Sequence, residues 1–172
     1  MRGIDTHNCG CFPTGHHYPG IIDQMDRTAY AVQELARCVT PDSRWIDAPL
    51  CVIDFETTGR DSETDRIIEI GLVYFDNGRC TQRHEWLINP GIPVPEESRA
   101  VHGITDDELK DAPAFCDVFD RIASILTDRI PVAYNAPFDR GFLHAEMRRV
   151  TQATPSEVPA FQNDVVWIDP LI

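Results

Sequence analysis

The fold is decided by one stretch of sequence, Leu50-Cys51-Val52-Ile53-Asp54-Phe55-Glu56-Thr57-Thr58-Gly59. Its short apolar start, which runs toward a turn signal, predicts a buried strand. Residues two apart in a strand point to the same face, so Asp54 and Glu56 should lie side by side where the strand leaves the core. Close carboxylates repel each other unless one is protonated or cations sit between them. The pair therefore indicates either a solvated strand end or a site for hard cations such as Mg²⁺ and Mn²⁺.

Length and composition bound the class of protein. The 172 residues suffice for one domain with a sizeable core, and a 42% hydrophobic content is ordinary for a soluble globular protein. A formal net charge of −13 argues against a broad basic surface for long nucleic acid. An enzyme that grips only one strand end is still compatible with this charge, because bound metal ions would supply positive charge at the phosphate.

The sequence contains neither an apolar run long enough to span a bilayer nor a recognisable signal peptide. We therefore expect a cytoplasmic protein without membrane contact. Its six cysteines are accordingly interpreted as reduced thiols, namely Cys9, Cys11, Cys38, Cys51, Cys80 and Cys116.

Residues 1–47 are expected to form an N-terminal extension to a main domain at 48–172. Residues 1–20 look irregular, whereas 21–39 carry apolar residues at helical spacing, which predicts an amphipathic helix. A zinc site is conceivable in the irregular part, but a flexible tail is the simpler interpretation, because the spacing of its candidate ligands is unusual. Those candidates are His7, Cys9, Cys11, His16 and His17.

The main domain begins with three strands that should form an antiparallel meander. The second and third strands are expected at 66–75 and 79–88, joined by Asp76-Asn77-Gly78, in which Asn-Gly suits a type I′ turn. Short helices follow at 96–102 and after Thr105-Asp106-Asp107-Glu108, which reads as a capping box.

Helices and strands then alternate. A longer helix, a strand at 130–134, a helix from Pro137 to about 150 and a last strand at 165–168 are expected. The order predicts a mixed α/β sheet with helices on both faces. The core face of the longer helix is Phe115, Val118, Phe119, Ile122 and Leu126.

A second strand end repeats the pattern of the first, in Tyr134-Asn135-Ala136-Pro137-Phe138-Asp139. Asp139 should sit in the first turn of a helix, where the helix dipole favours negative charge, and alone it would be an ordinary N-terminal acid. Together with Asp54 and Glu56, it makes three acids at two strand ends. If those strands are neighbours, the acids meet as in a two-metal phosphoryl-transfer site.

Three motifs stand out together: Asp54-Phe55-Glu56-Thr57-Thr58-Gly59, Val101-His102-Gly103-Ile104-Thr105 and Asn135-Ala136-Pro137-Phe138-Asp139. They resemble the motifs of the DEDDh 3′–5′ exonucleases, a family that includes the proofreading subunit of the bacterial replicative DNA polymerase and RNase T-like enzymes. The resemblance covers roughly residues 48–172 and implies an RNase H-like fold.

The resemblance also implies roles for the acids. Asp54 would bridge two divalent ions, Mg²⁺ or Mn²⁺, while Glu56 would bind the nucleophile-side ion and Asp139 would help to hold the second. The reaction would release nucleoside monophosphates from a free single-stranded 3′ end of DNA or RNA, with a DNA polymerase subunit as a possible partner. The terminal nucleotide would be bound by Thr57, Val101, His102, Tyr134, Asn135 and Phe138.

Two of these pocket residues have a local alternative. Phe138 offers a face on which any base could stack, but it could equally be a core residue at the start of the helix. His102 could be a helix-end residue with a local hydrogen bond. His144, which follows Asp139 on the same helix, is expected at the surface.

The sequence departs from the family at two points. Tyr134 stands where the family usually has histidine, and the family's last motif, a His-x4-Asp that supplies the general base and the fourth acid, is not found after Asp139. The domain is therefore interpreted as C-terminally incomplete, being either a fragment or a natural short form, and as weakly active or inactive. The alternative is a non-catalytic module that binds a nucleic-acid end or a polymerase or helicase partner.

Overall fold

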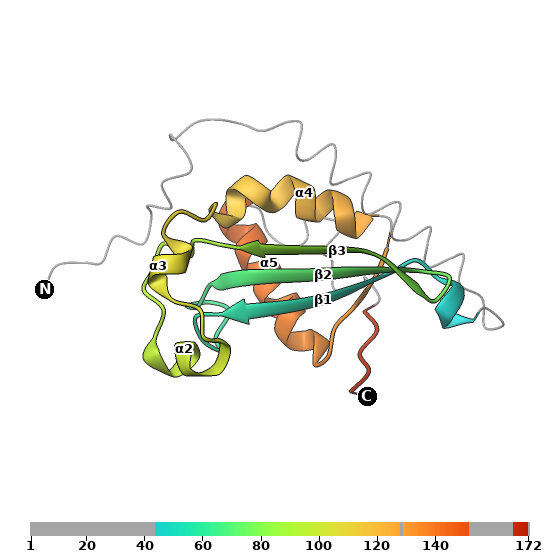
Figure 1. Cartoon of the computed structure of the whole chain (residues 1–172), viewed down its shortest axis with the longest axis horizontal. Coiled ribbons are helices and arrows are strands. Elements are labelled where there is room, and N and C mark those ends of the chain that lie inside the picture. Colours follow the sequence, from blue (N-terminus) through green and yellow to red (C-terminus); the bar gives the residue numbers. More distant parts are fainter. Residues whose placement is uncertain (1–43, 128, 152–166, 172) are drawn as a thin grey trace, which may run out of the picture.

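Figure 1 shows the computed structural model of the chain, in which residues 44–127, 129–151 and 167–171 are described. Within these ranges a short 3-10 helix, η1 (Trp45–Asp47), precedes the first strand. The strands are β1 (Leu50–Thr57), β2 (Ile67–Asp76), β3 (Arg79–Leu87) and β4 (Ile130–Val132). The helices are α2 (Glu96–His102), α3 (Asp106–Leu109), α4 (Phe115–Thr127) and α5 (Ala136–Thr151).

The described strands form one mixed sheet in the order β3-β2-β1-β4. β1, β2 and β3 are antiparallel neighbours, and β4 returns through α4 to pair parallel with β1. The predicted meander and the mixed sheet are confirmed. The β2–β3 turn has positive φ at Asn77 (51°) and Gly78 (71°), which the type I′ geometry requires. A Cβ at Gly78 would also lie 2.6 Å from the Ile46 side chain.

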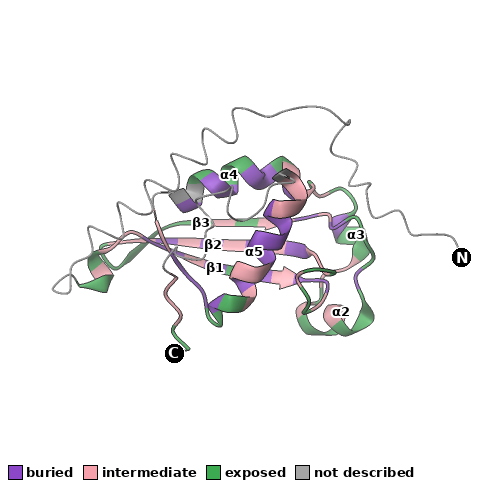
Figure 2. Ribbon diagram, turned by 180° about the vertical axis from the view of Figure 1, so that it is seen from behind, coloured by how far each residue is buried: buried purple, intermediate pink, exposed green. Residues whose placement is uncertain are grey.

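The core lies between one face of this sheet and the two long helices. Cys51, Ile53 and Phe55 of β1 point to this face, and their partners on β2 are Tyr74, Leu72 and Ile70. Seen from behind, α5 crosses in front of the strands and α4 runs along the β3 edge of the sheet, with buried residues on both helices (Figure 2). All five residues predicted for the core side of α4 are buried: Phe115, Val118, Phe119, Ile122 and Leu126.

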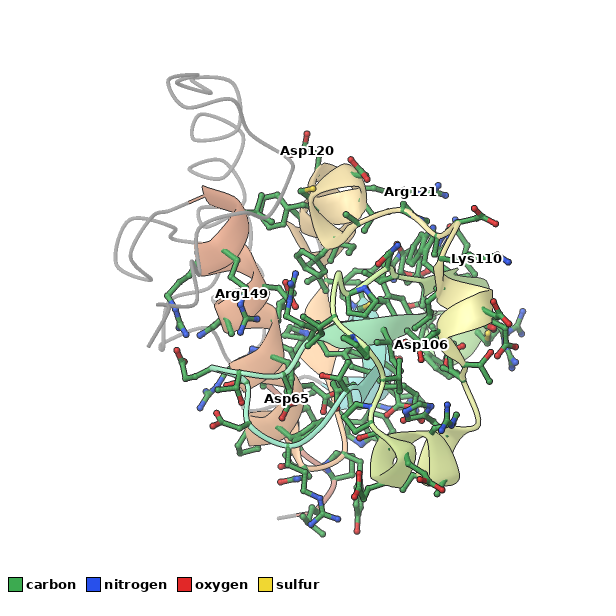
Figure 3. The ribbon with its side chains drawn as sticks, turned by 90° about the vertical axis from the view of Figure 1, so that its left-hand side faces the viewer. Asp65, Asp106, Lys110, Asp120, Arg121 and Arg149 are labelled. Carbon is green, nitrogen blue, oxygen red and sulfur yellow. The ribbon has the colours of Figure 1, made fainter. Side chains whose placement is uncertain are left out.

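The end of the sheet where β1 stops is closed by short elements. A small second cluster of Ile68, Val94 and Leu109 attaches α3 there. The predicted capping box is present, since Thr105 and Glu108 exchange hydrogen bonds at the start of α3. Figure 3 looks onto this end of the molecule, with α5 on one side of the strands and α3, marked by Asp106 and Lys110, on the other.

Two expectations about the second half of the chain need correction. β4 ends at Val132 rather than at 134, because the chain turns away at Asn135, whose φ is 59°. His144 is buried rather than at the surface, because α5 is enclosed on several sides in this region. Burial, and then Arg140 and Arg148, lower the pKa of His144 to about 4.

The described cysteines are not all reduced thiols. Cys51 and Cys80 are free, and burial raises the pKa of the Cys51 thiol to about 12, as suits a core residue. Cys116 is instead disulfide-bonded, which corrects the expectation for that residue. Cys116 is partly buried in the first turn of α4.

Several expectations lie outside the described residues. These are the extension before residue 44, its helix at 21–39, its conceivable zinc ligands, and residues 165 and 166 of the last strand. The described end of that strand forms a parallel bridge between Ile168 and Val132. None of the described helices has the length and apolar character needed to cross a bilayer.

Candidate active site

The two acids of β1 occupy the sheet face that α4 and α5 leave uncovered. Phe55 is buried in the core, whereas Asp54 is exposed and Glu56 is half-buried on the opposite face. The pairing confirms this arrangement, because residues directly opposite one another in a sheet share a face. Asp54 lies opposite Gly71, and Glu56 lies opposite Glu69. The predicted side-by-side acids are therefore present.

Two further acids on this face were not found from the sequence. Glu69 of β2 lies opposite Glu56, and Glu85 of β3 lies opposite Gly71. Burial raises the pKa of Glu69, and the charges of Glu85, Glu56 and Asp54 raise it further. The available signal was that Glu69 is the only charged residue between Ile67 and Phe75. Its position opposite Glu56, however, depends on the register of the strands.

Asp139 comes to the same strand from α5. It lies in the first turn of that helix and only 4% of it is exposed. Its Oδ1 accepts the backbone N–H of Phe55 at 3.2 Å, between the two acids of β1. β4 pairs with β1 only as far as Val52, so no described strand covers this N–H. Residues 84 positions apart in the chain are thereby joined.

The surroundings of Asp139 oppose its ionisation. Burial is the largest cause and the charge of Asp54 the second, with Asp169 adding a smaller effect, and together they raise the pKa of Asp139 to about 7. Hydrogen bonds from backbone N–H groups, including that of Phe55, act in the opposite direction. A carboxyl that titrates near neutrality beside a second acid is a common feature of functional sites.

The predicted pocket residues lie on three elements. Thr57 ends β1, where it is buried and its hydroxyl donates to the Gly59 carbonyl at 2.5 Å. Val101, in α2, is 82% exposed, and Tyr134, before α5, is 70% exposed, so both offer apolar surface to a ligand. Asn135 is exposed beside Tyr134. Phe138 is partly buried, with its ring centroid 4.9 Å from that of Phe142, so it also takes part in the core.

His102 has one satisfied ring nitrogen and one unsatisfied one. Its Nδ1 accepts the N–H of Ile104 at 3.0 Å, as the local alternative predicted. A ring nitrogen that accepts carries no proton, which leaves Nε2 as the N–H donor. Nε2 is buried and has no hydrogen-bond partner among the described residues. An unpaired buried donor is costly, so this atom is suited to an acceptor on a ligand.

α2 is tied to the end of the acidic strand. The hydroxyl of Ser98 donates to the Thr58 carbonyl at 2.6 Å. The Thr58 hydroxyl in turn donates to Asp65 at 3.2 Å and accepts from the Arg66 N–H at 3.0 Å. The helix that carries Val101 and His102 is thus fastened directly after Thr57.

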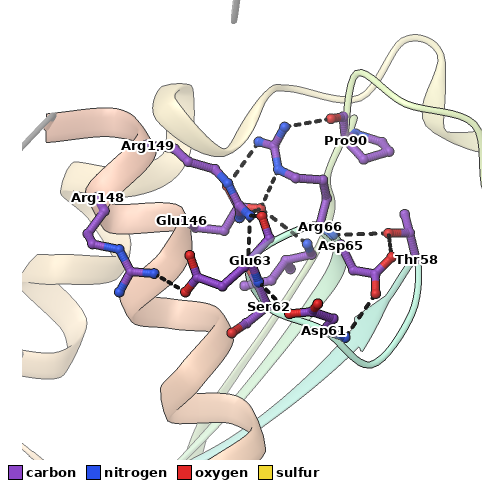
Figure 4. A network of polar contacts seen from close by, with 11 residues as sticks. Thr58, Asp61, Ser62, Glu63, Asp65, Arg66, Pro90, Glu146, Arg148 and Arg149 are labelled. Carbon is purple, nitrogen blue, oxygen red and sulfur yellow. Dashed lines mark hydrogen bonds and ion pairs between the residues drawn. The ribbon is translucent and has the colours of Figure 1, made fainter. Parts of the chain in front are cut away.

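A network of ion pairs centred on the buried Glu146 holds the β1–β2 loop against α5 (Figure 4). The Arg66 guanidinium donates to both carboxylate oxygens of Glu146, at 2.6 and 2.9 Å. Arg149 donates to the carbonyls of Ser62 and Glu63, and also lies 3.3 Å from Glu146. The loop that follows the acidic strand is therefore braced by the helix that carries Asp139.

The donor set fits a hard divalent cation in its chemistry. Asp54, Glu56 and Asp139 offer only carboxylate oxygens, which Mg²⁺ and Mn²⁺ prefer. A cation there would also offset the repulsion between Asp54 and Asp139. Within the described ranges, no three His, Cys, Asp or Glu side chains are grouped closely enough to hold one ion in common.

Comparison with known proteins identifies a family. The family described as "Exonuclease" matches residues 51–168. The chain is 36% identical to the PolC-type DNA polymerase III of Thermotoga maritima over 119 residues, which are 69% of this chain and 9% of that protein. It is 42% identical to the epsilon subunit of DNA polymerase III of Treponema pallidum over 94 residues, 55% of this chain and 44% of that protein. The chain thus spans less than half the length of these relatives.

One group of solved structures shares the fold. The zinc-bound form of the E. coli ExoI–ssDNA complex superposes with a TM-score of 0.58 at 17% identity, covering 72% of this chain and 27% of that one. At this identity the likeness concerns the fold, which is that of an exonuclease domain with a mixed sheet.

Proposed function

The chain belongs to the exonuclease family, and we propose that residues 48–172 are a domain for metal-dependent 3′–5′ hydrolysis of nucleic-acid ends. The observation that carries this proposal is the hydrogen bond from the Phe55 N–H to Asp139. It joins the acid of the third motif to the strand that bears Asp54 and Glu56. The products would be nucleoside monophosphates, as in DNA proofreading or repair.

The acids would hold the metal ions. Asp54, Glu56 and Asp139 are the proposed ligands of Mg²⁺ or Mn²⁺, with two ions in a complete domain. When bound, such ions activate a water molecule and stabilise the leaving 3′-oxygen. Asp139 would have to lose its proton first, because a ligating carboxylate is deprotonated.

The remaining motif residues would hold the terminal nucleotide. The Nε2–H of His102 would donate to an acceptor on that nucleotide, which would satisfy its unpaired proton. The exposed side chains of Val101 and Tyr134 and the partly buried ring of Phe138 would contact the base or sugar without selecting a particular base. Thr57 and Asn135 complete the proposed set.

DNA is the proposed substrate, and a DNA polymerase subunit is the proposed partner. The similarity to polymerase III PolC-type and epsilon proteins supports both proposals. The ExoI–ssDNA complex, whose fold is shared, is consistent with a single-stranded end. An RNA end is the other substrate to be tested.

We expect these 172 residues by themselves to be weakly active or inactive. After Asp139 they contain no His-x4-Asp motif, the family's last one, so they lack both the general base and the fourth acid that this motif supplies. A general base typically contributes about 10²–10⁴-fold in rate. The second candidate function, a non-catalytic module that binds a nucleic-acid end or a partner, is favoured by this missing base and by Tyr134.

The test combines Mn²⁺ titration with a cleavage assay on the same sample. Single-stranded DNA and RNA, labelled at the 5′ end, report successive loss of 3′ nucleotides, and a 3′ label reports release of the terminal one. We expect Mn²⁺ binding that Asp54→Ala abolishes and Asp120→Asn, an exposed change on α4, preserves, with little cleavage. Strong cleavage would reject the predicted inactivity, and binding of DNA without Mn²⁺ would favour the module.

A further inference from the structure

Asp169 accepts hydrogen bonds from three backbone N–H groups. Its Oδ1 accepts from Asn135 at 3.1 Å and from Leu171 at 2.9 Å, and its Oδ2 accepts from Ala136 at 3.0 Å. The N–H of Asn135, the last residue of the β4–α5 connection, and that of Ala136, the first residue of α5, are thus bound by a side chain more than 30 positions later. Asp169 belongs to none of the three family motifs.

The bound connection is a sharp turn that needs an external partner. Asn135 has a φ of 59°, in the left-handed region that is uncommon for residues other than glycine. α5 begins at the next residue, and the first N–H groups of a helix have no partner inside it. A carboxylate at this position satisfies the first of these helix donors, that of Ala136, together with the N–H of Asn135 before it, and is favoured by the helix dipole.

The same turn determines where Asp139 lies. Asp139 follows Ala136 by three residues in the first turn of α5, and its Oδ1 meets the Phe55 N–H at 3.2 Å. A shift of the helix start would therefore move Asp139 relative to β1. It would also move Asn135, whose own N–H is one of the groups bound by Asp169.

We propose that Asp169 is a positioning residue for the candidate site: by binding the start of α5, it holds Asn135 and Asp139 in register with Asp54 and Glu56. The contribution of Asp169 to metal and nucleotide binding rests on the proposed function, whereas its effect on the position of α5 relative to β1 does not. Asp169 itself is not a proposed metal ligand.

A matched control is offered by the start of α4. There Asp117 Oδ2 accepts the N–H of Ala114 at 3.0 Å, so a carboxylate also binds a helix start, but α4 carries no proposed site residue. If Asp169 merely stabilised a helix end, Asp117→Ala and Asp169→Ala would have the same effect on the Phe55 amide and on Mn²⁺ binding.

The experiment follows the Phe55 amide by NMR in the metal-free protein and measures the Mn²⁺ dissociation constant. With Asp169→Ala, we expect the Phe55 amide signal to shift and its hydrogen exchange to accelerate, and the Mn²⁺ dissociation constant to rise about tenfold, the lower end for residues that orient metal ligands. Asp169→Asn keeps one acceptor oxygen and should be intermediate in both. Asp117→Ala should change neither.

The proposal is overturned if Asp169→Ala leaves the Phe55 amide as in the parent protein, or if Asp117→Ala perturbs it equally. Should Asp169→Ala fail to fold, Asp169→Asn decides by the same two criteria. If the parent protein binds no Mn²⁺, or if Asp54→Ala binds it unchanged, the proposed function fails instead. The Phe55 amide, which needs no metal, then still tests the positioning by Asp169.

Discussion

At the scale of single residues, the requirements of stability and of the proposed function conflict at Asp139. It is almost fully buried, it lies near Asp54, and it receives a backbone hydrogen bond from Phe55. A neutral residue would be easier to bury there. This conflict is expected of a carboxylate whose negative charge is stabilised only when a cation is bound.

Replacing Asp139 by asparagine should stabilise the metal-free protein at high pH. The pKa of Asp139 is raised from 3.8 to about 7 in the folded state, so folding favours its protonated form. Its contribution to stability is therefore present below about pH 4 and is lost as the pH rises toward 7. Asp139→Asn removes this loss and should increase the free energy of unfolding by on the order of 1–3 kcal/mol at pH 8.

This prediction is checked by urea unfolding without divalent ions at pH 5 and pH 8. The gain should be larger at pH 8, and the exposed control Asp120→Asn should show no gain. A variant that is less stable than the parent protein at pH 8 would contradict the electrostatic account of Asp139.

A second test concerns the Nε2 atom of His102. His102→Asn retains an oxygen able to accept the Ile104 N–H, as Nδ1 does now at 3.0 Å, but it lacks the donor at Nε2. We expect nearly unchanged urea unfolding and a loss of about 1 kcal/mol in binding of a nucleoside monophosphate, which is roughly fivefold in affinity. Calorimetric titration with dAMP measures this loss, and unchanged affinity would remove His102 from the pocket.

At the scale of elements, charged side chains join the β1–β2 loop to α5. Glu146 is 1% exposed and binds Arg66 in a bidentate pair, with Arg149 beside it. Buried pairs contribute little net stability compared with apolar residues, but removal of one partner leaves an uncompensated charge. The connection is therefore sensitive to any change in one member.

Glu146→Ala should consequently destabilise the protein by roughly 3–5 kcal/mol. The control is Asp107→Ala in α3, where the ion pair with Lys110 is exposed and should contribute less than about 1 kcal/mol. Urea unfolding curves of both variants provide the comparison. Equal small losses would show that the loop is held by something other than the Arg66–Glu146 pair.

At the scale of the whole molecule, part of the excess of negative charge lies on the sheet face that carries the candidate site. The chain has a formal net charge of −13, and Asp54, Glu56, Glu69 and Glu85 share the face of the sheet opposite α4 and α5. Their mutual repulsion is visible in the raised pKa of Glu69, for which burial is the first cause and neighbouring carboxylates the next. Divalent cations should relieve this repulsion in the folded state alone.

Mn²⁺ should therefore raise the melting temperature, and more strongly at pH 8 than at pH 6. The metal must displace the proton of Asp139, whose pKa is about 7, so its apparent affinity falls as the pH drops below that value. At 100 times the dissociation constant, binding stabilises by about 2.7 kcal/mol, which corresponds to several degrees in Tm. Two controls are needed: thermal unfolding of Asp54→Ala with Mn²⁺, and thermal unfolding of the parent protein in NaCl at the same ionic strength.

An equal rise in Tm at both pH values would argue against Asp139 as a ligand. A rise that persists in Asp54→Ala would place the cation elsewhere on the acidic surface.

Much of this molecule follows from local sequence patterns. The period of two in residues 50–57 predicted that Asp54 and Glu56 share a face, and Asn77-Gly78 predicted the hairpin with both φ values positive. The apolar spacing in α4 and the Thr105–Glu108 capping box were also predicted correctly. These features depend on residues within a few positions of one another, and local geometry is sufficient to produce them.

The tertiary structure alone decided the rest, because it depends on which distant segments meet. Strand register brings Glu69 and Glu85 beside the acids of β1, and the packing of α5 buries His144. The short β4 leaves the Phe55 N–H for Asp139, and Asp169 reaches back to the start of α5. Residues so far apart in the chain carry no local signal of their contact. The local sequence therefore determines in which helix, strand or turn each of them lies, whereas the fold determines which residues it contacts.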